Sequence, residues 1–154
     1  MKKLLLLTSV LILSISVRAQ VISIAEARTK NIGDVVTVSA TVTNGEELGG
    51  VRYMQDGTGG IAAFGGLDAV LRNDSITITG ELSDFFGLLE ISPVSTFEVH
   101  GQAQNEIIPL VLTPNQIDEN SEGQLIQINN IIFNDGGGNF AANTTYGFSS
   151  NGEE

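Results

Sequence analysis

The chain has 154 residues with seven basic and eighteen acidic side chains, a formal net charge of −11. It has no cysteine and a single histidine, His100. Disulfides, cysteine nucleophiles and zinc sites built from several histidines or cysteines are therefore excluded within this chain. An acidic surface also repels phosphate backbones, so any binding of nucleic acid is expected to be weak.

The first nineteen residues have the pattern of a secretory signal peptide. Two lysines, Lys2 and Lys3, precede an apolar run from Leu4 to Val17 that is broken only by four hydroxyl residues, and Ala19 supplies a small residue for cleavage. The run is shorter than the roughly 20 apolar residues of a membrane-spanning helix. Cleavage after Ala19 leaves four basic and eighteen acidic residues, a net charge of −14. We expect a secreted or cell-surface protein with no membrane span after cleavage.

A short helix and a strand are expected next. Ser23-Ile24-Ala25-Glu26 fits a capping box, in which serine and glutamate each accept a backbone N–H of the other residue. The helix should end before Gly33. From Val36 to Val42 apolar and hydroxyl residues alternate, which predicts a strand from Val35 to Asn44 with one buried face. The buried positions are Val36, Val38, Ala40 and Val42.

The segment from Tyr53 to Ile61 predicts a hairpin, because the turn Asp56-Gly57-Thr58-Gly59-Gly60 joins two short apolar runs. The glycines suit the positive backbone angles of a tight turn. A calcium site, or close approach of a ligand to this backbone, is the alternative interpretation. We favour the turn.

Another strand is predicted from Ser75 to Leu82, with Ile76, Ile78 and Leu82 facing inward. Gly80 interrupts the inward row and indicates a bulge or sharp bend. The chain continues through Phe85-Phe86-Gly87 into an apolar run from Leu88 to Ile91, the fifth predicted strand.

The order of these elements over about residues 22 to 93, three strands, a short linker and two further strands, resembles the OB-fold. The turns resemble those of OB-like domains from secreted bacterial proteins, of the type found beside extracellular nucleases and in surface proteins with C-terminal sorting domains. The resemblance implies an all-β fold, with a five-stranded OB-like barrel at residues 20–97. It also implies that strands 2 and 3 and the adjoining loops face oligonucleotides or oligosaccharides.

A second OB-like repeat is expected to begin in the C-terminal part. Residues 33–38 align without gaps to residues 123–128, an offset of 90, and Thr113-Pro114-Asn115-Gln116 repeats the capping-box pattern. We therefore assign residues 98–110 to a linker and residues 111–154 to an incomplete second repeat. Since three strands of that repeat are missing, we expect the chain to be the N-terminal part of a longer gene product.

Candidate ligand-binding residues follow from the direction of the side chains on strand 2. If Met54 points into the barrel, Tyr53 faces outward and can stack on a base or a sugar. The opposite parity, which buries Tyr53, remains open. The expected ligand residues are three further aromatics and the two nearest cations, namely Phe64, Phe85, Phe86, Arg52 and Arg72.

No catalytic motif is present, and His100 lies in the expected polar linker. We expect no enzyme activity, cofactor or metal site in this chain. The preferred hypothesis is a secreted or cell-surface accessory module that weakly binds single-stranded nucleic acid or glycan. One alternative is the N-terminal part of a secreted nuclease or phosphoesterase whose catalytic domain lies beyond residue 154. The other is a structural spacer in a surface protein. In each case further domains of the same polypeptide are the expected partners.

Overall fold

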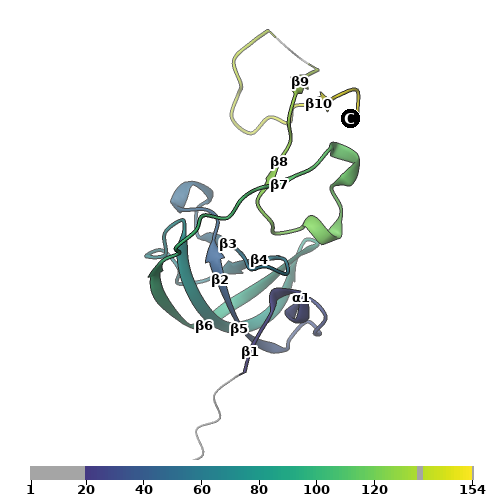
Figure 1. Cartoon of the computed structure of the whole chain (residues 1–154). Helices are drawn as coiled ribbons and strands as arrows, with labels where there is room; N and C mark the ends of the chain where they lie inside the picture. Colours follow the sequence, from purple (N-terminus) through teal and green to yellow (C-terminus); the bar gives the residue numbers. More distant parts are fainter. Residues whose placement is uncertain (1–19, 135–136, 154) are drawn as a thin grey trace, which may run out of the picture.

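The computed structural model describes residues 20–134 and 137–153. A β-barrel occupies the N-terminal part, and the chain then leaves it towards two short strand pairs, the second of which lies far from the barrel (Figure 1). The expected signal peptide, residues 1–19, lies outside the described residues. Within the described ranges, no helix is long and apolar enough to cross a membrane.

Five strands form the barrel. They are β2 (Val35–Val42), β3 (Val51–Gln55), β4 (Gly60–Phe64), β5 (Asp74–Phe85) and β6 (Leu88–Gln102). Neighbours pair in the order β2, β3, β4, β6, β5, and β5 pairs back with β2 to close the barrel. Only β4 and β6 run parallel within this ring. The fold is therefore all-β with a closed five-stranded OB-like barrel, which confirms the expectation from the sequence.

The barrel interior contains the apolar residues predicted from the period of two. Val38 on β2 is the direct cross-strand partner of Ile78 on β5, and both side chains are fully buried. The alternation holds along both strands because every second side chain points to the same face. The other predicted inward residues are all buried, namely Val36, Ala40, Val42, Ile76 and Leu82.

Helix α1 (Ile24–Ala27) packs on the barrel through Ile24 and Ala27, both fully buried. Ser23 accepts the Glu26 N–H at 3.1 Å, as the capping box predicted. The reciprocal half of the box is replaced, because the Glu26 carboxylate pairs with Lys30 at 3.0 Å. Separately, the Ile24 N–H donates to Asp56 Oδ2 at 2.9 Å, which ties the start of the helix to the β3–β4 turn. The preceding strand, β1 (Val21–Ile22), runs parallel to β2.

The predicted hairpin is formed by β3 and β4. At its turn, Asp56 Oδ1 accepts the N–H of Thr58 at 2.7 Å and the N–H of Gly59 at 3.1 Å. With Oδ2 bound to the helix, both carboxylate oxygens already have donors. The contacts of Asp56 therefore support the turn interpretation of this glycine-rich segment.

The predicted irregularity at Gly80 is present as a shift in the β5–β6 register. A Cβ atom at this position would lie 2.6 Å from Cγ2 of Ile91 and 2.7 Å from the carbonyl oxygen of Pro93. Only glycine fits here without displacing the neighbouring strand, which accounts for a glycine at this irregularity of the β5–β6 pairing.

The last barrel strand is longer than expected. Strand β6 continues through Gln102, so residues 98–102, which the sequence analysis assigns to the linker, pair with β5 in the barrel sheet. This extension pairs only with β5 and is exposed, so its sequence is as polar as that of a loop. His100 lies on it, with Nε2 at 2.8 Å from the hydroxyl of Thr77.

The C-terminal part contains two short strand pairs. Strand β7 (Leu110–Val111) runs parallel to β8 (Ile126–Gln127), and β9 (Ile131–Phe133) runs antiparallel to β10 (Phe148–Ser150). Between β7 and β8 lie two 3₁₀ turns, η2 (Pro114–Gln116) and η3 (Glu119–Ser121). The described residues of this part form no second barrel.

Candidate functional site: an aromatic groove on the barrel

The register of three strands creates one row of side chains on the outer face of the barrel. Tyr53 on β3 is opposite Ala62 on β4, and Ala62 is the parallel partner of Glu90 on β6. Met54 is fully buried in the core, so Tyr53 points outward. Of the two side-chain directions considered for β3, the protein therefore adopts the one that places Tyr53 on the outer face.

A groove of about 460 Å³ follows this row. We call it the Tyr53 groove. It is lined by residues from the β2–β3 loop, the outer faces of β3, β4 and β6, and the two sides of the β5–β6 turn, namely Leu48, Gly50, Val51, Tyr53, Phe64, Phe85, Leu88, Glu90 and Ser92. Its position corresponds to the strand 2–3 face and the adjoining loops on which OB-folds bind oligomers.

Three of the predicted aromatic residues meet in this groove. Tyr53 is half-buried in its wall, while Phe64 and Phe85 are 51% and 58% exposed. Phe86 does not line the groove. It occupies the β5–β6 turn with a φ of 53° and is 96% exposed, and its ring stands edge-on to that of Phe85 at 4.9 Å between centroids.

Arg52 is not available to a ligand at this face, contrary to expectation. Its side chain has the same parity as Met54 and is 1% exposed. Nε donates to the carbonyl of Val70 at 2.8 Å, and Nη1 donates to Gly49 at 2.7 Å and to Val51 at 3.0 Å. Three backbone carbonyls thus accept hydrogen bonds from Nε and Nη1 of the buried guanidinium, which joins the β2–β3 and β4–β5 loops.

Arg72 is exposed on the β4–β5 loop but does not line the Tyr53 groove. Its charge reaches the neighbouring loop at Glu47. There the pKa of the Glu47 carboxyl is lowered chiefly by the hydrogen bond from the Gly45 N–H, with smaller contributions from Arg72 and Arg52.

The other two cations of the described chain are held in ion pairs. Arg28 binds Glu119 and Glu122, and Lys30 binds Glu26. Among the residues that line the Tyr53 groove there is no lysine or arginine.

Six residues that line the groove are not among the candidates from the sequence, namely Leu48, Gly50, Val51, Leu88, Glu90 and Ser92. Glu90 is 8% exposed and accepts a hydrogen bond from the hydroxyl of Ser83 at 3.3 Å. The alternation of β6 was a usable signal, since a buried Ile91 turns Glu90 to the outer face. That this face meets Tyr53 depends on the β4–β6 pairing, which the sequence does not reveal.

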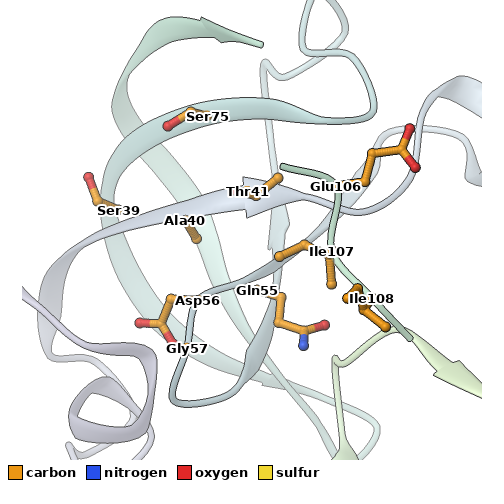
Figure 2. A pocket seen from close by; sticks show the side chains of 10 residues that line it. All are labelled: Ser39, Ala40, Thr41, Gln55, Asp56, Gly57, Ser75, Glu106, Ile107 and Ile108. Carbon is orange, nitrogen blue, oxygen red and sulfur yellow. The ribbon is translucent and has the colours of Figure 1, made fainter. Parts of the chain in front are cut away.

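A second hollow, of about 590 Å³, lies between the barrel and the segment that leaves it. Figure 2 shows Ile107 and Ile108 of that segment near Gln55, with Glu106 and the Asp56 turn at opposite sides. This hollow has no aromatic residue, and its Asp56 carboxylate already binds the turn and the helix. Within the described ranges, no three His, Cys, Asp or Glu side chains cluster as metal ligands do. The Tyr53 groove is therefore the stronger candidate for a binding site.

No protein-family model and no curated protein matches this chain. Among solved structures, that of the hypothetical protein YgiW from E. coli is similar, with 17% sequence identity and a TM-score of 0.45. The match covers 53% of this chain and 90% of that protein. The OB-like assignment rests on the strand order of the chain itself, which places the described residues 35–102 in an OB-like barrel.

Proposed function

We propose that this chain is a non-catalytic OB-like binding module that holds a glycan in the Tyr53 groove. The observation that carries the proposal is the convergence of Tyr53, Phe64 and Phe85 from three separate elements on one exposed groove without a cation. Binding sites for small and oligomeric ligands combine apolar and aromatic walls with a few polar groups. The pattern of residues 1–19 supports a place of action outside the cell or on its surface.

Charge is the reason to prefer a glycan to single-stranded nucleic acid. Non-specific affinity for nucleic acid comes mainly from lysine and arginine that neutralise phosphates. Glu90 is the one charged residue among those that line the groove, and it carries the wrong sign for phosphate. A sugar, by contrast, presents an apolar ring face to the aromatic rings, and its hydroxyl groups can donate to the Glu90 carboxylate.

The test is a titration of residues 20–154 with neutral hexasaccharides (cello-, chito- and malto-oligosaccharides) and with a twelve-residue oligothymidylate. Binding is monitored by the NMR chemical shifts of the backbone amides. We expect at least one of the hexasaccharides to shift the amides of β3, β4 and the β5–β6 turn. Tyr53→Ala and Phe85→Ala should each weaken this binding about tenfold, which corresponds to about 1.4 kcal/mol.

Phe140→Ala is the matched control, because Phe140 is also an exposed aromatic residue, at 66%, but lies outside the groove. Its affinity should equal that of the wild type. If oligothymidylate binds and Tyr53→Ala weakens that binding, the ligand of the groove is a nucleic acid and not a glycan. If no probe shifts these amides, the proposal fails and a spacer role takes its place.

A further inference from the structure

The Tyr53 ring stands between two hollows. Beside the Tyr53 groove lies a smaller one of about 300 Å³, which shares Leu48 and Tyr53 with it. We call it the junction hollow. Its opposite wall is formed by residues 123–126, at and just before strand β8, so the C-terminal part contributes directly to the surface beside the candidate site.

The wall is fixed to the barrel by contacts from three elements. At the C-terminal end of α1, the guanidinium of the capping residue Arg28 donates to the carboxylates of Glu119 at 2.9 Å and Glu122 at 3.0 Å. From β3, Oε1 of Gln55 accepts the N–H of Leu125 at 3.0 Å. Arg28 is 16% exposed and Glu122 19%, so this ion pair is better shielded from solvent than a typical surface pair.

The third contact is a close approach of two glycines. A Cβ atom on Gly60 of β4 would lie 2.3 Å from the carbonyl carbon of Gly123, and one on Gly123 would lie 2.8 Å from that of Gly60. Gly123 also has a φ of 71°. Any other residue at either position would push the backbones apart, and a side chain at Gly123 would in addition strain its own backbone.

We propose that residues 123–126 form a second subsite, so that the ligand is an extended neutral glycan that crosses the Tyr53 ring and occupies both hollows. This inference rests on the proposed function and names the form of the ligand. The shared Tyr53 and Leu48 make the two hollows neighbours along one surface. The junction hollow offers further apolar contacts at Leu125 and Ile126, and no charged residue lines it.

The experiment uses cello-, chito- and malto-oligosaccharides of two to eight units, titrated into residues 20–154. For the wild type we expect affinity to rise at least tenfold from the disaccharide to the hexasaccharide, and amide shifts at residues 124–126 only with the longer oligomers. In Gly123→Ala the wall is displaced, so the gain with length should disappear while disaccharide affinity stays within twofold. Tyr53→Ala should weaken every length.

Hydrogen exchange of the Leu125 amide shows whether the wall has moved, and Gln55→Ala, which removes the acceptor of that N–H, provides a second way to loosen it. Affinity that does not increase with length, or a gain that survives in Gly123→Ala when its Leu125 amide has lost protection, overturns the second subsite and leaves the Tyr53 groove intact as a binding site. Absence of binding at every length overturns the proposed function and this inference with it.

Discussion

Val38 and Ile78 lie directly opposite each other across β2 and β5, and neither side chain has any exposed surface. Ile78→Ala should therefore cost about 2–4 kcal/mol of unfolding free energy, from the lost transfer of the side chain and the cavity left behind. Denaturant unfolding measures the change. Glu81→Ala, an exposed position on the same strand, is the control and should stay within about 0.5 kcal/mol. A loss below 0.5 kcal/mol for Ile78→Ala would contradict the inward parity of β5.

The buried Arg52 yields a second prediction about stability. Arg52→Met keeps much of the apolar stem but leaves the carbonyls of Gly49 and Val70 without their donor, and a buried unsatisfied polar group costs about 1–3 kcal/mol. We expect a loss of about 2 kcal/mol or more in denaturant unfolding. Arg72→Met, at the exposed arginine, should be close to neutral. Equal effects of the two substitutions would mean that the guanidinium of Arg52 is not structurally important.

The burial of Arg52 follows from the alternation of side chains along β3, but the partners of its guanidinium do not. Once Met54 is taken as inward, a period of two places Arg52 on the same inward face. The positive charge suggested a surface position, but at this end of the barrel three backbone carbonyls replace water around the guanidinium. Those carbonyls belong to loops whose course cannot be derived from the sequence alone.

The Tyr53 groove likewise contains residues that the sequence predicts and residues that it does not. The order of strands along the chain and the hairpin at Asp56 follow from local patterns that the sequence contains. The direction of Tyr53 is one of two that the sequence leaves open, and the burial of Met54 decides it. Glu90 and Leu88 join Tyr53 only because β6 pairs in parallel with β4, where Ala62 is the partner of Glu90 from 28 residues further along the chain. Such long-range register has no local signal, so the aromatic members of the site were predictable and its acidic member was not.

The loop at Gly45 provides a prediction about pH. Because the Gly45 N–H donates to the Glu47 carboxylate, the folded-state pKa of Glu47 lies below the ordinary glutamate value. A lowered pKa means that this contact stabilises the fold above the unfolded-state pKa and is lost as pH falls through the folded-state pKa. NMR titration of the Glu47 carboxyl should show the lowered value, and the Gly45 amide shift should follow it. In Glu47→Gln the amide transition should vanish, and its persistence would assign it to another group.

Hydrogen exchange should divide the C-terminal part into a docked and an undocked portion. The Leu125 amide donates to Gln55 of the barrel, whereas the Asn134 amide donates to Gly147 within the remote β9–β10 pair. We expect protection to decrease from Val38 in the core to Leu125 and then to Asn134, since local opening is easiest where few buried contacts exist. Asn134 protection equal to that of Val38 would show that residues 131–150 unfold together with the barrel.

The last prediction concerns salt. Binding through phosphate contacts releases counterions, and its affinity falls steeply as salt concentration rises. No lysine or arginine lines the Tyr53 groove or the junction hollow. The glycan affinity should therefore change less than about twofold between about 50 and 200 mM NaCl, a range over which nucleic-acid affinity falls by orders of magnitude. Arg72→Gln should likewise leave the affinity unchanged, because Arg72 lines neither hollow. A steep salt dependence that Arg72→Gln abolishes would instead indicate an anionic ligand that reaches the β4–β5 loop, and the aromatic groove would then hold only its uncharged part.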